Sequence, residues 1–190
     1  MSGLTFHRGG GSGGASGTWE RLSTATASAS ATVDFTGLSS SYVAYKVVFS
    51  HVVPATDNVN LWLRTSTDGG SSFDAGASDY GWANSAYFDS AATNNFGDAA
   101  DSEISFTGNN NTGTGTGEQM SGVLHLLNSS AAQYAQAVWQ GSMANQNGVH
   151  LYYSGAGRRL SAADVDAIRF LFSSGNIASG QFDLYGMKAA

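Results

Sequence analysis

The sequence contains no cysteine, and this absence excludes several kinds of site. Without thiols the chain can form no disulfide framework, zinc–thiolate centre or iron–sulfur cluster, and it has no cysteine nucleophile. Proline occurs once, at Pro54, where its missing N–H should end a strand. Stability must therefore come from a hydrophobic core, and a chain of this length can bury about 70% of its unfolded surface.

Charged residues are also scarce. They make up 12% of the 190 residues, with 8 Lys and Arg against 14 Asp and Glu, for a net charge of −6. Non-specific nucleic-acid binding needs a basic stripe, but the only adjacent basic pair is Arg158-Arg159. No apolar run approaches the roughly 18 to 20 residues that span a bilayer, and residues 1–17 lack the apolar middle of a signal peptide. We expect a soluble protein with neither nucleic-acid binding nor membrane insertion.

Glycine dominates the end of the first 17 residues, in Gly9-Gly10-Gly11 and Gly13-Gly14. Such a composition buries too little apolar surface to offset its ordering entropy, so these residues should be disordered in an isolated chain. We interpret residues 1–17 as an extended arm that other subunits hold in place, and the alternative is a flexible leader. The arm side chains expected to make assembly contacts are Leu4, Phe6, His7 and Arg8.

From residue 18 onward the hydrophobic pattern has a period of two, which is typical of half-buried strands. Clear alternation covers 43–49, 59–63, 135–143, 149–153, 168–172 and 182–184, and weaker runs cover 18–25, 32–35, 79–88, 102–106 and 119–128. About ten short strands with almost no helical signal predict an all-β fold. We expect one domain over 18–190, an antiparallel, jelly-roll-like β-sandwich.

Several connections carry turn signals. Asn147-Gly148 suits a two-residue hairpin with positive φ at both central residues, and we expect a similar hairpin at Asp68-Gly69-Gly70. The sequence Ser161-Ala162-Ala163-Asp164 matches a capping box and predicts a single helical turn. Residues 107–117 are a polar, low-complexity stretch, which we interpret as a slack loop or a contact between subunits.

The sharpest local motif is S-x-D-x-G-x-x-F, formed by Ser66, Asp68, Gly70 and Phe73. It fits the Asp box, in which the carboxylate accepts hydrogen bonds from turn amides while the aromatic residue packs beneath the turn. The motif resembles the repeated hairpins of sialidase-like propellers, although this chain has one copy. In those folds the motif lies away from the active site. The resemblance therefore implies a structural turn and no catalysis.

Carboxylates and histidines are the candidate catalytic or metal-binding groups. Asp98, Asp101 and Glu103 could supply the acid pair of a glycoside hydrolase, or bind calcium together with Asn94 and Asn95. Their spacing matches no calcium loop, and an ordinary solvated loop is the favoured interpretation. The four histidines form no metal-binding pattern, and no Gly-x-Ser-x-Gly elbow occurs. We therefore predict no catalytic residue, no cofactor and no metal ligand.

Aromatic residues outside the alternating core pattern are the best clue to a ligand. Aromatic faces beside amide and carboxylate groups suit either sugar stacking or a subunit interface, where tyrosine and tryptophan are enriched. We favour the interface and keep sugar binding as the alternative. The residues singled out are Trp62, Tyr80, Trp82, Tyr87 and Tyr152.

Four stretches resemble a known group of proteins: residues 26–35, 54–58, 66–73 and, most specifically, 168–186 with Ile168-Arg169-Phe170-Leu171-Phe172-Ser173-Ser174-Gly175. They look like tailed-bacteriophage virion proteins, described as tail, fibre or minor structural components. Residues 74–166 show no such resemblance. The family supplies no catalytic residues to carry over.

The resemblance implies a non-enzymatic virion protein made in the bacterial host cytoplasm, a tail or fibre component or a head decoration, that binds other virion proteins. Such sandwiches often associate around a symmetry axis, and we expect a homo-oligomer, with a trimer favoured. The alternative is a receptor-recognition module at a fibre tip that binds a host surface glycan. A glycoside hydrolase is the less favoured third option.

Overall fold

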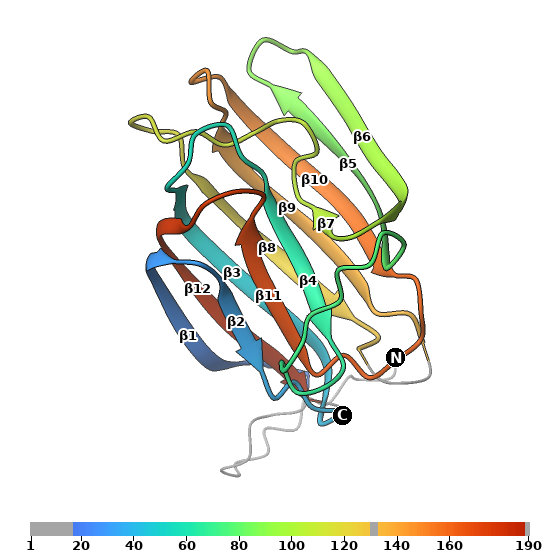
Figure 1. The fold of residues 1–190 in the computed structure, drawn as a ribbon. Coiled ribbons are helices and arrows are strands. Elements are labelled where there is room, and N and C mark those ends of the chain that lie inside the picture. Colours follow the sequence, from blue (N-terminus) through green and yellow to red (C-terminus); the bar gives the residue numbers. More distant parts are fainter. Residues whose placement is uncertain (1–16, 130–132, 189–190) are drawn as a thin grey trace, which may run out of the picture.

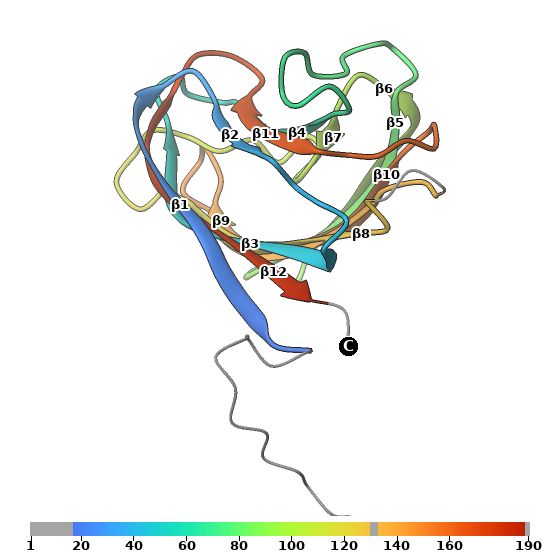
Figure 2. The same ribbon diagram turned by 90° about the horizontal axis from the view of Figure 1, so that it is seen from below.

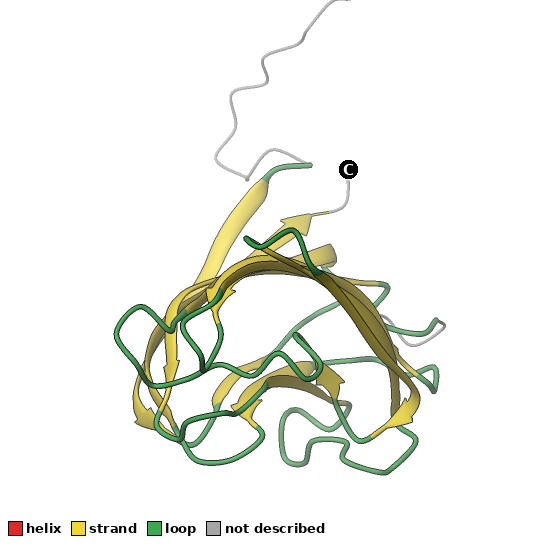
Figure 3. Cartoon of the chain, turned by 90° about the horizontal axis from the view of Figure 1, so that it is seen from above, coloured by secondary structure: helices red, strands yellow, loops and turns green. Residues whose placement is uncertain are grey.

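The computed structural model describes residues 17–129 and 133–188 as two antiparallel β-sheets packed face to face (Figure 1). The larger sheet has the strand order β1-β12-β3-β8-β9-β10-β5-β6, and the smaller has the order β2-β11-β4-β7. Seen along the strands, the larger sheet curves around the smaller one (Figure 3). The all-β sandwich is confirmed, while its jelly-roll-like character stays a prediction. The arm residues Leu4, Phe6, His7 and Arg8 lie outside the described residues.

The strands of the larger sheet are β1 (Trp19–Ser30), β3 (Tyr42–Pro54), β5 (Tyr80–Phe88), β6 (Thr93–Asp101), β8 (Met120–Leu127), β9 (Gln136–Ala144), β10 (His150–Arg159) and β12 (Ile177–Lys188). Those of the smaller sheet are β2 (Val33–Thr36), β4 (Leu61–Ser66), β7 (Ile104–Ser105) and β11 (Ala167–Phe172). No helix in these ranges is long and apolar enough to cross a membrane.

The two sheets form two layers (Figure 2), and the buried hydrophobic side chains of both form one core cluster. Phe49 and Phe182 reach it from the larger sheet, and Phe170 reaches it from β11 of the smaller sheet. Their rings lie 5.1 to 6.3 Å apart between centroids. Trp139 is fully enclosed, and its indole N–H donates to the carbonyl oxygen of Phe106 at 2.8 Å. The aromatic residues thus provide the large side chains that join the sheets.

Alternation in the sequence predicts most inward-facing residues. Leu61, Leu63, Ile168 and Phe170 are completely buried, as their period of two requires. Val43 is the exception, because its side chain is 51% exposed although it shares the odd-numbered face with Tyr45. The pairing register between β3 and β12 shifts at this end of the strand. Such an irregularity turns the neighbouring side chain to the other face.

Strand β6 was missed by the sequence patterns, which indicate an irregular, alanine- and asparagine-rich segment there. It is the edge strand of the larger sheet and pairs with β5 alone. Almost all of its side chains are exposed, so it carries no hydrophobic alternation. Asp98 and Asp101 consequently lie on a strand and not in the predicted loop.

Two turn predictions need correction. The β9–β10 hairpin has a three-residue loop, because Asn145 N–H bonds to the Val149 carbonyl at 2.9 Å and Gly148 N–H to the Asn145 carbonyl at 2.8 Å. Gly148 has φ 72°, whereas Asn147 is absent from the positive-φ residues of the described chain. The turn at Asp68 joins β4 to β5, which belong to different sheets, so it is not a hairpin.

Two further segments differ from expectation. Residues 161–164 form no helical turn, because the amides that would close it, those of Val165 and Asp166, donate to the carbonyls of Ser129 and Ser66. Residues 107–113 are largely packed and not slack, whereas residues 114–117 are exposed. Thr112 is completely buried, and its backbone bridges Val59 on one side and Asn145 on the other.

Candidate binding surfaces

Trp62 and Trp82 line the same hollow, although they belong to different sheets. Trp62 lies on the outward face of β4, and Trp82 lies on β5. Both line a hollow of about 170 Å³ that also includes Asp101, Glu103 and Asn60. This hollow, the tryptophan cleft, is small beside the roughly 300–1,000 Å³ of most small-molecule sites.

The two carboxylates of the tryptophan cleft are held by donors from their own surroundings. Asp101 accepts the indole N–H of Trp82 at 2.9 Å and the backbone N–H of Ser102 at 2.7 Å. Glu103 accepts from the Ser102 hydroxyl and forms an ion pair with Arg64 at 3.2 Å. Trp82 and Asp101 both belong to the larger sheet, whereas Arg64 of β4 holds Glu103 directly before β7 of the smaller sheet. The contacts therefore fix the two ends of the short connection from β6 to β7. They suit a structural clamp better than an acid–base pair.

The third acid and the proposed calcium ligands lie elsewhere. Asp98 bonds to the backbone N–H of Ala100 at 3.0 Å, within its own strand. Asn94 contacts Asn110, while Asn95 accepts from the Ser85 hydroxyl on the opposite face of the sheet. No group of three or more His, Asp or Glu residues that could hold a metal ion occurs in 17–129 and 133–188.

Tyr80 is a core residue, which corrects its prediction as a ligand or interface aromatic. Its side chain is completely buried. The phenol accepts from the Thr65 N–H at 2.8 Å and donates to the Asp74 carbonyl at 3.1 Å. Burial is the main cause that raises the pKa of Tyr80 to about 12. The hydroxyl therefore stays protonated and ties β5 to the end of β4.

Tyr87 and Tyr152 lie together on the outer face of the larger sheet. They are directly opposite each other on β5 and β10, with exposed fractions of 51% and 41%. Their ring centroids are 6.0 Å apart, and the Tyr152 hydroxyl donates to Gln140 Oε1 at 3.2 Å. Unlike the tryptophans of the cleft, these rings present much of their surface to solvent.

Sequence patterns missed a second aromatic cluster on the outer face. Lys46 Nζ lies 4.7 Å from the ring centroids of both Trp19 and Tyr185, and His125 packs edge-on against Trp19 at 5.7 Å. Burial first, and the Lys46 charge second, lower the pKa of His125. These residues come from four different strands, so no local sequence signal could have revealed the cluster.

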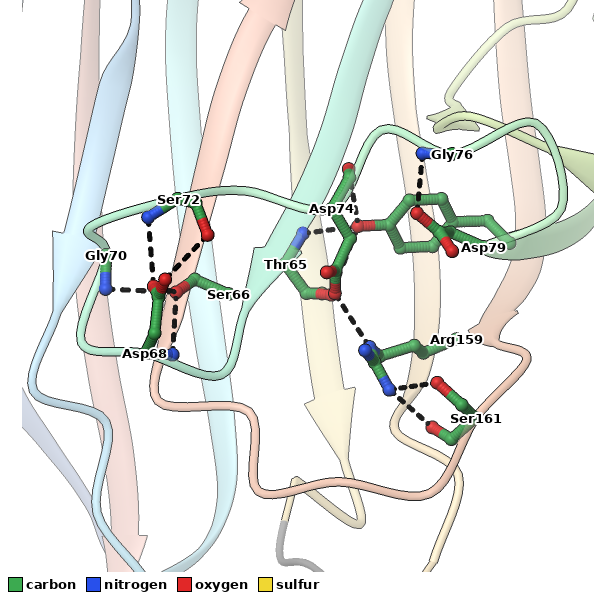
Figure 4. Close-up of polar contacts among 11 residues, drawn as sticks. Thr65, Ser66, Asp68, Gly70, Ser72, Asp74, Gly76, Asp79, Arg159 and Ser161 are labelled. Carbon is green, nitrogen blue, oxygen red and sulfur yellow. Dashed lines mark hydrogen bonds and ion pairs between the residues drawn. The ribbon is translucent and has the colours of Figure 1, made fainter.

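The predicted Asp box has the expected hydrogen bonds (Figure 4). Ser66 Oγ accepts from the Gly70 N–H at 3.0 Å, and the Asp68 carboxylate accepts from the Ser72 N–H at 2.9 Å and hydroxyl at 2.6 Å. Phe73 packs against the Arg169 guanidinium, 3.9 Å from its ring centroid. The four motif residues thus form a structural turn, anchored to β11.

Replacing Asp68 with asparagine should lower the melting temperature near neutral pH. Hydrogen bonds from Ser72 hold the pKa of Asp68 at about 2, below its usual 3.8. A carboxyl with a lowered folded-state pKa stabilises the fold above pH 3.8, and this stabilisation disappears as the pH falls towards 2. Thermal unfolding of both proteins from pH 6 to pH 2 should therefore show the two curves converging. Asp89→Asn, in the exposed β5–β6 turn, is the matched control.

Comparison of the chain with protein-family models, curated proteins and solved structures gave no match. The function is therefore inferred from the residues and their geometry.

Proposed function

We propose that this protein is a non-enzymatic structural component of a tailed-bacteriophage virion. The observation that carries the proposal is where the chain enters the sandwich. Gly17 N–H bonds to the Lys188 carbonyl at 3.5 Å, and Lys188 forms an ion pair with Glu20 at 3.1 Å. Gly17, the first described residue, thus lies at one end of the sandwich, while the β5–β6 and β9–β10 turns lie at the opposite end (Figure 1).

This arrangement of opposite ends suits a virion protein that is attached at one end and exposes the other. In the proposed arrangement, residues 1–16 bind neighbouring virion proteins, and the rigid sandwich projects outward as a tail, fibre or head-decoration component. Copies associate with one another, with a trimer favoured because closed rotation satisfies a repeated interface. Support also comes from the resemblance of residues 168–186 to virion proteins, and from the engagement of Asp101 and Glu103 in structural contacts.

Removing residues 1–16 should eliminate the protein from purified virions without unfolding its body. The sandwich has its own core, and Gly17 remains to pair with Lys188, so the melting temperature of the shortened chain should change little. Incorporation is measured by immunoblotting of purified particles, and the body by thermal unfolding.

A matched variant distinguishes the contribution of the predicted contact residues to incorporation from that of the glycine-rich linker. Scrambling residues 9–16 while keeping Leu4, Phe6, His7 and Arg8 should leave incorporation intact. Retention of the shortened chain on particles would contradict the role of the arm as anchor. Loss of the full-length chain from every virion fraction would contradict the proposed function itself.

A further inference from the structure

A groove runs along the outer face of the larger sheet, over β9, β10, β5 and β6. Two adjoining hollows of about 640 and 370 Å³ form it, and they share Ala83 and Val138. It is distinct from the tryptophan cleft, which opens between the sheets, although β5 contributes to both. Along β5 it extends from Gly81 to Ser85, four residue steps that correspond to roughly 13 Å of strand.

The cross-strand register explains why the surface is hollow here. Ala156 of β10, Ala83 of β5 and Gly97 of β6 lie side by side, so three neighbouring strands present small side chains in one row. In the same row β9 presents Val138, which is 43% exposed and forms a wall. The next row, Ser154, Ser85 and Asn95, is polar.

Polar groups and an aromatic pair surround this floor. Asn95 accepts from the Ser85 hydroxyl at 2.6 Å with its amide oxygen, and Gln140 accepts from Tyr152 at 3.2 Å in the same way. Each amide keeps its NH₂ group as a donor for a ligand. At one end of the groove the rings of Tyr87 and Tyr152 stand two residues beyond Ser85 and Ser154, on the same face.

Charge is nearly absent from the groove, although the chain carries a net charge of −6. Among the described residues that line the two hollows, Arg158 is the only ionisable one, and it lies at the end away from the tyrosines. An uncharged ligand matches such a surface best. A second copy of the chain would bring another net charge of −6 against this face.

We propose that this groove binds an extended, neutral polysaccharide chain. The flat carbohydrate faces would stack on Tyr87 and Tyr152, while sugar hydroxyls would bond to Asn95, Gln140, Ser85 and Ser154. The small floor of Ala83, Gly97 and Ala156 lets the chain lie along β5 and β10. Polysaccharide binding goes beyond the proposed structural role in the virion, because the sandwich alone would bind the ligand.

The test uses the purified full chain and soluble, unbranched neutral polysaccharides, namely a glucan, a mannan and a galactan. Affinity electrophoresis identifies the chain that binds, and isothermal titration measures its affinity. Tyr152→Ala and Tyr87→Ala should each weaken binding about tenfold, as expected for aromatic residues that contribute strongly to an interface. Ser85→Trp should abolish binding, because the indole fills the floor. Thermal unfolding verifies that each variant is folded.

Trp62→Ala, in the tryptophan cleft, is the matched control and should leave affinity unchanged. Loss of binding in Trp62→Ala but not in the tyrosine variants would overturn the groove and place the sugar in the cleft. No binding by any of the three polysaccharides would also overturn the proposal. So would a change of oligomeric state in Ser85→Trp, measured by light scattering, because the face would then be an interface between copies. None of these outcomes affects retention on virions, so the two proposals fail separately.

Discussion

Replacing Phe170 with alanine should destabilise the sandwich by about 3–5 kcal/mol, the usual cost of deleting a buried phenylalanine ring. Phe170 is completely buried on β11 of the smaller sheet. Its ring centroid lies 5.1 Å from that of Phe182, 6.0 Å from that of Phe106 and 6.3 Å from that of Phe49. Because Phe49 and Phe182 belong to the larger sheet, the substitution opens a cavity where the two layers meet.

Urea unfolding followed by tryptophan fluorescence measures this loss. Tyr87→Ala is the control, since its exposed ring contributes little to folding and its removal should change the free energy of unfolding by less than about 0.5 kcal/mol. A decrease of less than about 1 kcal/mol in the free energy of unfolding of Phe170→Ala would contradict the packing of this ring between the two sheets.

Adding one methyl group at Gly141 should destabilise the protein by about 3 kcal/mol, the upper range for overpacking a core. Gly141 and Gly122 are directly paired on β9 and β8, and the buried Tyr153 hydroxyl lies over both. A Cβ at Gly141 would overlap the Tyr153 hydroxyl oxygen and the carbonyl oxygen of Ser121. The carbonyl belongs to the backbone of a central strand, so it cannot move aside without breaking the ladder.

Gly157→Ala is the matched control on the inner face of the adjacent strand β10. There the added Cβ would lie 3.1 Å from Cδ1 and Cγ2 of Ile104 and from Cβ of Trp82, a tight contact without the overlap found at Gly141, so a smaller loss is expected. The Tyr153 phenol should also lose its hydrogen bond to the Ser121 carbonyl in Gly141→Ala, but not in the control. Equal unfolding energies for the two variants, measured in urea, would show that the glycine pair is not required.

The inward faces of several strands could be predicted from the sequence, because a period of two directly reports burial on one side. Leu61, Leu63 and Phe170 illustrate this success. The same rule fails for β6, whose exposed edge position removes the hydrophobic signal, and for Val43, where a register shift reverses the face. It also fails for Tyr80, whose polar hydroxyl is satisfied by backbone groups from another part of the chain.

The candidate surfaces could likewise be predicted only in part from the sequence. The hydrogen bonds of the Asp box could be predicted because its donors and acceptors lie within eight residues. The meeting of Trp62 with Asp101, and of Tyr87 with Tyr152, could not be predicted, because each pair comes from strands whose pairing order is not local. The role of the exposed aromatic residues as ligand or interface contacts stays a prediction.

The sequence alone therefore determined the all-β class, the main inward-facing residues and the turn at Asp68, since each depends on chain neighbours and on alternation. The tertiary structure alone decided the eight-plus-four division of strands, the enclosure of Tyr80 and the groove over β5 and β10. Those features depend on register between strands far apart in the chain. A shift of one residue in β5 or β6 would exchange the faces of that strand and bring a larger neighbour, such as Trp82 or Phe96, into the row in place of Ala83 or Gly97.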